Sequence, residues 1–243
     1  MIRFIALFLI FFAFTYSNAQ DYDSTFTDDQ DSSLVDTTKV LQDSISVDSV
    51  LINAEKRFRD SIEIINKKVE ILQKSRAAYN TGLDFLNNKE LDSAIFYFSK
   101  AILIDSTFSD AYYSRGLCFE KVNIDSSLSD YTMAYTLDST NLEPLYKIAS
   151  IQSSFDIKLA ISTYNIIITL DNQSSISHYE IGMLEYLEGN IDEAILSFTR
   201  ALKINPEART YNDRGSCYRK LEKYELAIED YLTAINLNPN LAF

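Results

Sequence analysis

The feature that most constrains this 243-residue chain is a period of 33 or 34 residues that occurs five times after residue 75. Four columns of the repeat stay in phase. The first is small and holds Gly82, Gly116, Ala149, Gly182 and Gly215. The second holds Ala94, Ser127, Ala160, Ala194 and Ala227. The third is aromatic and holds Phe98, Tyr131, Tyr164, Phe198 and Tyr231. The fourth holds Ala101, Ala134, Ile167, Ala201 and Ala234. A fixed period of this length predicts stacked, similar units.

The columns are explained by helix packing. Small residues let two paired helices approach closely, and the aromatic residue fills the space between hairpins. One hairpin alone leaves an apolar face exposed, which stacking buries. Each unit closes with a turn signal such as Ile104-Asp105-Ser106 or Ile204-Asn205-Pro206. The chain has 5 Gly and 3 Pro, too few for a fold of many hairpin loops, so helices are favoured over strands.

The columns resemble the tetratricopeptide repeat (TPR) family. The stretches nearest its pattern run from Asn190 to Pro206 and from Tyr211 to Pro239. The resemblance covers residues 75–243 and implies an all-α, right-handed superhelical solenoid of about five helix-turn-helix repeats. Their expected bounds are 75–108, 109–141, 142–174, 175–207 and 208–243. The departures are Ala149 for Gly, Ser127 for Ala, and Ser106, Ser139 and Asn172 for Pro. Each substitute is small or turn-forming, so we expect the fold to survive them.

Residues 1–19 have the pattern of a secretory signal peptide. Arg3 precedes an apolar run from Phe4 to Tyr16, and small residues end at Ala19, where a peptidase is expected to cleave. The alternative is a retained anchor, but the run is shorter than the ~20 residues of a spanning helix. We therefore expect an exported protein, either periplasmic or secreted to the cell surface.

Residues 20–47 are rich in Asp, Ser and Thr, and we expect them to form a disordered acidic linker. The chain has a formal net charge of −13, which excludes nucleic acid as a favoured partner and argues against membrane attachment beyond the signal peptide. Asp-Ser-Thr and Asp-Thr-Thr sites in this segment resemble the acceptor sites for O-glycans in exported Bacteroidetes proteins. Chance matches in so biased a composition are the alternative.

Residues 48–74 predict an amphipathic helix. Its apolar residues recur at steps of three and four, and they are Leu51, Ala54, Phe58, Ile62, Ile65, Val69 and Leu72. No Gly or Pro interrupts the stretch before Gly82, so the helix is expected to run into the first repeat. It either caps the end of the array or forms a coiled-coil dimer.

Little in the chain points to catalysis, a cofactor or a bound metal. Cys118 and Cys217 occupy the same repeat position three units apart, too far for a disulfide, so both are interpreted as buried packing residues. His178 is the only histidine, and it falls where the family places a packed aromatic residue. Glu180 and Glu185 lie five apart on one helix and point apart. We expect no enzyme, with an accessory subunit or an enzyme acting on envelope glycans or peptides as the alternative.

The resemblance also implies a partner-binding surface, since TPR proteins generally hold a peptide or a partner helix on their inner, concave face. The family's inner positions correspond in this chain to a tyrosine ladder and its surroundings. They are Tyr79, Asn80, Leu83, Tyr113, Leu117, Glu120, Lys121, Tyr146, Lys147, Tyr179, Glu180, Met183, Tyr186, Asn212, Asp213, Arg219 and Lys220. Tyrosine offers large contact area at low entropic cost, which suits protein recognition. The alternative is that the ladder is partly structural.

Chaperone-tail recognition is not implied, because Glu180 and Asp213 stand where some TPR domains have cationic or amide groups. At the other end of the array, Leu226, Ile228, Leu232 and Ile235 spread apolar area around the last helix. We expect that end to contact a second copy or another partner, and the alternatives are a shortened chain or a tolerated exposed patch. Self-association is thus expected through residues 48–74 or through this C-terminal face. The predicted function is an exported TPR scaffold in a periplasmic or cell-surface assembly.

Overall fold

The computed structural model describes residues 37–240, with side chains described from Ser49 onward. The predicted signal peptide and residues 20–36 of the predicted linker lie outside the described residues. The described chain contains helices and no strand, as expected. The helices are α2 (Thr37–Asn87), α3 (Leu91–Ile104), α4 (Ser109–Phe119), α5 (Ile124–Leu137), α6 (Glu143–Gln152), α7 (Ile157–Leu170), α8 (Ser175–Glu188), α9 (Ile191–Ile204), α10 (Ala208–Lys220) and α11 (Tyr224–Leu237). The described chain divides into two units between Asp60 and Ser61.

Helix α2 begins earlier than the sequence predicts. It starts at Thr37, inside the stretch assigned to a disordered linker, so the linker boundary at residue 47 is wrong. No Gly or Pro occurs between Thr37 and Thr81, and extending an existing helix costs far less than nucleating one. As expected, the helix continues without a break into the first repeat and ends at Asn87.

The expectation that this helix caps the array is also wrong. In the unit of residues 61–243, Ile62, Ile65, Val69 and Leu72 are 38–58% exposed, so they are not buried against the repeats as a cap would be. Two polar residues of the first repeat, Thr81 and Asp84, stand at the repeat positions of Arg115 and Cys118. The coiled-coil interpretation stays a prediction.

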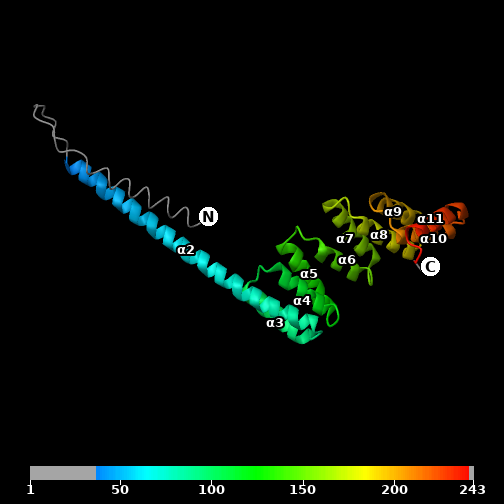
Figure 1. Ribbon diagram of the computed structural model, residues 1–243, viewed down its shortest axis with the longest axis horizontal. Helices are drawn as coiled ribbons and strands as arrows, with labels where there is room; N and C mark the ends of the chain where they lie inside the picture. The colour runs from blue at the N-terminus through cyan, green and yellow to red at the C-terminus, as the bar shows by residue number, and fades with distance from the viewer. Residues whose placement is uncertain (1–36, 241–243) are drawn as a thin grey trace, which may run out of the picture. The chain divides into compact units, whose positions relative to one another are not determined.

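From the end of α2 onward, the helices follow one another in antiparallel pairs (Figure 1). Each pair falls within one predicted repeat, and consecutive pairs pack against each other. The aromatic column forms the centre of the first four units: Phe98, Tyr131 and Phe198 are fully buried, and Tyr164 is 4% exposed. Cys118 and Cys217 are both free and buried in this packing, which confirms their structural interpretation. Burial raises the pKa of each thiol to about 11. The five-repeat solenoid is thus confirmed.

The glycine column lets the two helices of a pair touch. A methyl group added at Gly82 or Gly182 would lie 2.7 Å from the ring of Phe98 or Phe198. The third repeat has Ala149 here, and its geometry differs accordingly. The centroids of its two packed rings, Tyr146 and Tyr164, lie 6.5 Å apart, against 5.5 to 5.7 Å in repeats one, two and four. The extra methyl group is accommodated by a wider ring spacing.

Two repeats carry a buried ion pair that joins three helices. Arg115 of α4 binds Asp130 of α5 through two hydrogen bonds of 2.8 Å and donates a third, of 3.0 Å, to Ser99 of α3. Arg214 of α10 repeats this pattern with Asp230 and Thr199. Aromatic rings flank each guanidinium at 5.5 to 5.8 Å. These paired charges link consecutive repeats.

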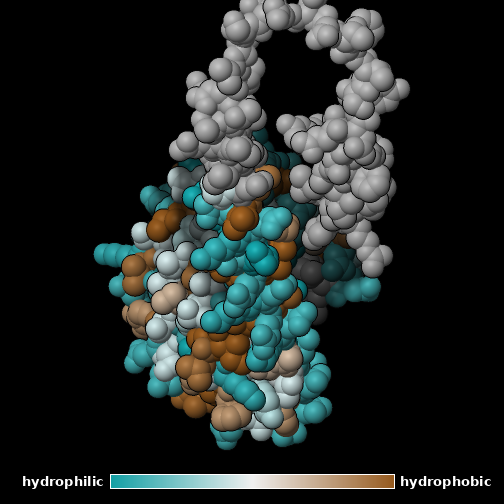
Figure 2. Space-filling view, turned by 90° about the vertical axis from the view of Figure 1, so that its left-hand side faces the viewer, coloured by the Kyte–Doolittle hydropathy of each residue, from teal (hydrophilic) through white to brown (hydrophobic). Residues whose placement is uncertain are grey.

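Large apolar side chains reach the surface at several places. On the face shown in Figure 2 they form patches separated by hydrophilic residues. On α11, Leu226, Ile228, Leu232 and Ile235 are 43–58% exposed. Ile228 and Ile235 occupy the same repeat positions as Ile195 and Leu202 of the preceding repeat. Those two side chains are partly or fully buried where α10 follows. An interface on α11 stays a prediction. Within residues 37–240, no helix combines the length and apolarity needed to span a bilayer.

Candidate partner-binding site on the first helices

The predicted site residues lie along the first helices of the five repeats, and we call this set the first-helix row. Tyr79, Asn80 and Leu83 are on α2; Tyr113 and Leu117 are on α4, with Glu120 and Lys121 directly after it. Tyr146 and Lys147 are on α6; Tyr179, Glu180, Met183 and Tyr186 are on α8. Asn212, Asp213, Arg219 and Lys220 are on α10.

The tyrosine ladder is partly structural, which is the alternative interpretation given in the sequence analysis. The hydroxyl of Tyr79 lies 3.1 Å from Ser114 of the next first helix. Tyr146 reaches Ser174 in the same way at 2.6 Å. Tyr179 donates to Asp213 at 2.8 Å. Three of the four tyrosines therefore bridge neighbouring repeats and brace the row that they line.

Tyr113 differs from the other three. Its ring packs on Tyr131, 5.5 Å between centroids, but in the described residues its hydroxyl has no hydrogen-bond partner. Burial raises the pKa of this hydroxyl, and the charges of Glu143 and Glu120 add to the effect. The Tyr113 side chain is half-buried. It therefore presents a polar atom that a partner can bind.

Charged side chains of the row also meet across repeats. Lys147 lies 3.1 Å from Glu120, whose carboxylate also accepts a hydrogen bond from the buried Tyr131. The Lys220 ammonium lies 4.7 Å from the centre of the Tyr186 ring. Leu83 and Met183 pack against the core beneath the row, while Asn80, Lys121 and Arg219 are exposed. The row thus offers both aromatic and charged surface.

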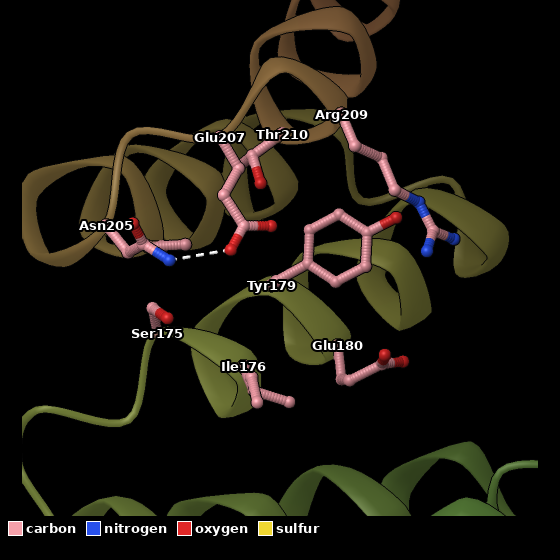
Figure 3. A pocket seen from close by; sticks show the side chains of 9 residues that line it. Ser175, Ile176, Tyr179, Glu180, Asn205, Glu207, Arg209 and Thr210 are labelled. Atoms are coloured by element: carbon pink, nitrogen blue, oxygen red, sulfur yellow. Dashed lines mark hydrogen bonds between the residues drawn. The ribbon is translucent and has the colours of Figure 1, made fainter. Parts of the chain in front are cut away.

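The row is hollowed between α8 and α10 by a cavity of about 170 Å³. It is lined by Ser175, Ile176, Tyr179, Glu180, Ala201, Asn205, Glu207, Arg209 and Thr210, most of which Figure 3 shows. The Arg209 guanidinium lies 4.9 Å from the centre of the Tyr179 ring and 3.9 Å from Asp213. Asn205 donates to Glu207 at 2.6 Å. The cavity therefore combines an aromatic wall with charges of both signs.

Glu180 is the half-buried carboxylate of this cavity. Burial raises its pKa, and the nearby Arg209 charge only partly offsets the effect. In Figure 3 the Glu180 and Arg209 side chains extend to the same side of the Tyr179 ring, and no bond joins them. Glu180 therefore faces the cavity with free acceptor atoms.

The sequence reasoning missed part of this cavity. Arg209 and Ile176 were not among the predicted site residues, although both line it. They belong to one column of the repeat, three residues before the tyrosine ladder: Arg76, Asp110, Glu143, Ile176 and Arg209. The signal was present as that column, which lies one helical turn from the ladder and so on the same face.

The row has no arrangement that suggests catalysis. Glu185 accepts a hydrogen bond from Asn190 at 2.7 Å and does not converge with Glu180. His178 is partly buried, and this burial together with the Arg200 charge lowers its pKa. In the part of the chain that the structure describes, no group of three or more His, Cys, Asp or Glu side chains is placed to hold a metal ion.

Comparison with known proteins assigns the last two repeats to one family. The tetratricopeptide repeat pattern matches residues 175–208 and 208–241. Human tetratricopeptide repeat protein 13 is 40% identical over 52 residues, which are 21% of this chain and only 6% of that protein.

Solved structures share the fold. MamA is 20% identical with a TM-score of 0.59, over 65% of this chain and 94% of its own. YrrB, described as a TPR protein with an unusual peptide-binding site, is 22% identical with a TM-score of 0.56, over 72% and 93%. PilF of Pseudomonas aeruginosa is 18% identical with a TM-score of 0.57, over 69% and 78%. With the period, the helix pairs and the glycine contacts, these matches show that residues 175–241 are tetratricopeptide repeats and that the whole repeat array has the tetratricopeptide repeat fold.

Proposed function

We propose that this protein is an exported scaffold that holds a protein or peptide partner on its first-helix row, within a periplasmic or cell-surface assembly. The observation that carries the proposal is the row itself: partly exposed aromatic and charged side chains follow one another across five consecutive first helices. Surfaces of this composition are typical of protein recognition sites. The peptide-binding site named for YrrB, a protein of the same fold, supports the proposal.

Export is supported by the sequence of residues 1–19, which has the basic start, apolar run and small residues of a signal peptide. The net charge of −13 keeps such a protein soluble and disfavours anionic surfaces as binding partners. Fusion of residues 1–30 to a periplasmic reporter enzyme tests export. Activity of the reporter outside the cytoplasm is expected, and retention inside the cell contradicts the assignment.

Self-association belongs to the same proposal. The exposed stripe Ile62, Ile65, Val69 and Leu72 supports pairing of two copies through α2. Light scattering of the mature chain is expected to give a dimer, and Ile65→Lys with Val69→Lys is expected to give a monomer. A monomer for the unmodified chain contradicts the coiled-coil interpretation and leaves the scaffold function standing.

Partner capture from envelope extract tests the row. The row variant Tyr186→Ala, Arg219→Ala, Lys220→Ala removes one aromatic and two cationic side chains. The matched control Phe96→Ala, Lys100→Ala, Lys203→Ala does the same on second helices, where all three residues are exposed. The row variant is expected to lose at least fivefold of each captured partner, while the control retains them. Equal capture by both variants, with both folded by circular dichroism, contradicts the proposal.

A further inference from the structure

The partly buried carboxylates of the described chain differ in whether they have a hydrogen-bond or ion-pair partner. Residues 49–240 contain eight carboxylates that are buried or half-buried: Asp105, Glu120, Asp130, Asp138, Glu180, Glu185, Asp213 and Asp230. Seven of them accept hydrogen bonds from named side chains or backbone groups. Of these eight, Glu180 alone accepts no hydrogen bond and forms no ion pair in this described part of the chain. No buried side-chain oxygen of the described residues lacks a hydrogen-bond partner, so the Glu180 carboxylate is in contact with solvent at the cavity and is open to a ligand from outside.

The surroundings of Glu180 indicate what it can bind. Tyr179 supplies one wall of the cavity. Glu180 lines the same cavity as this ring. A cavity that offers both a carboxylate and an aromatic wall is a favourable place for an ammonium or guanidinium group, which gains an ion pair and contact with the ring.

The charge balance of the cavity also favours a cation. Arg209 is the only cationic residue that lines it, and its charge is partly offset by Asp213, 3.9 Å away. Glu180 and Glu207 are acidic lining residues. A bound carboxylate would meet this acidic excess, whereas a cation would be attracted by it and by the overall charge of −13.

We propose that the cavity between α8 and α10 receives a lysine or arginine side chain of the partner, with Glu180 as its counter-ion. This inference rests on the proposed function and names the chemistry of the occupant. The volume of about 170 Å³ fits one side chain rather than a folded surface, and Ile176, 60% exposed at the rim, is placed to contact the apolar stem of that side chain.

Short peptides test the inference in the full mature chain. The probes are N-acetylated, C-amidated Ala-Leu-X-Leu-Ala peptides in which X is lysine, norleucine or glutamate. Their affinities are measured by NMR titration of backbone amides. The lysine probe is expected to bind at least fivefold more tightly than the norleucine probe and to perturb residues of α8 and α10. Glu180→Gln is expected to abolish this preference, and Glu193→Gln, an exposed change on α9, is expected to preserve it.

Each other outcome overturns the inference. It is wrong if no probe binds, if lysine and norleucine bind equally, or if Glu180→Gln keeps the lysine preference. A preference for the glutamate probe that Arg209→Gln removes would make the cavity an anion site instead. The proposed function is judged separately: if capture of envelope partners depends on the row but not on Glu180, only this inference fails.

Discussion

The Arg214–Asp230 pair and the Glu180 carboxylate show two ways in which this fold treats charge. Between the helices, Arg214 satisfies both oxygens of Asp230 and also reaches the preceding repeat. On the first-helix row, Glu180 is half-buried with no bonded partner in the described residues. The first arrangement is complete within the chain, so its role is structural. The second is incomplete, and we infer that a partner completes it.

The largest effect is expected when one member of the Arg214–Asp230 pair is removed. Arg214→Ala leaves Asp230, only 6% exposed, without its partner. We expect a loss of about 3 kcal/mol in the free energy of unfolding, measured by denaturant titration. The double variant Arg214→Met, Asp230→Leu removes both charges and is expected to cost less. Similar losses for the two variants would contradict this account, because they would show that the cost does not come from leaving the Asp230 charge without a partner.

The glycine column gives the next largest effect. Gly182→Ala places a methyl group 2.7 Å from the Phe198 ring, which must shift. A loss of about 1–3 kcal/mol in unfolding free energy is expected. Gly189→Ala is not a fair control because Gly189 has a φ of 85°. Ala149→Gly is the matched control, and it should cost no more than the ~1 kcal/mol of helix propensity. A neutral Gly182→Ala would contradict the account of the glycine column.

Tyr179 belongs both to the packing between helices and to the first-helix row. Its ring packs on Phe198, and its hydroxyl donates a hydrogen bond to Asp213 on the row. Tyr179→Phe removes that bond only. We expect a loss of about 1 kcal/mol in thermal or denaturant unfolding. Tyr113→Phe, whose hydroxyl has no partner in the described residues, is expected to be neutral. Equal costs for the two changes would contradict the structural role of the ladder.

The smallest effect concerns Glu180 itself. Its pKa in the folded chain is raised above the ordinary value of 4.5, so folding disfavours the ionised form. This penalty exists at neutral pH and disappears as the pH falls through the folded pKa and then below 4.5. Glu180→Gln is therefore expected to raise the melting temperature by about 1 °C at pH 7 and to leave it unchanged at pH 3.5. A lower melting temperature for the variant at pH 7 would show that Glu180 is already satisfied.

The fold could be predicted because the repeat pattern is imposed by packing. An aromatic ring lies against Gly82 and against Gly182, which leaves no room for a larger side chain. The glycine column of the sequence therefore indicates a contact between the two helices of a pair. The stripe from Ile62 to Leu72 is also a correct helix pattern, yet it left open whether the repeats or a second copy covers it, and these residues are 38–58% exposed. An apolar stripe shows which residues share a face of a helix, but not what covers that face.

The cavity was only half predictable for a related reason. Tyr179 and Glu180 follow from the row's column, but the cavity depends on how far α10 lies from α8 and on the course of the Asn205–Glu207 turn. Those distances are set by packing between repeats and have no local sequence signature. The buried Arg115–Asp130 pair was missed because its members are 15 residues apart and recur in only one other repeat.

The most direct test of partner binding on the first-helix row is site-specific photocrosslinking in the intact mature protein. p-Benzoylphenylalanine replaces Tyr113 on the row or, in a second sample, Phe96, which is 63% exposed on the second helix α3. After irradiation in envelope extract, crosslinked partner is expected from position 113 and not from position 96. Crosslinks from position 96 alone, or equally from both, would contradict the account.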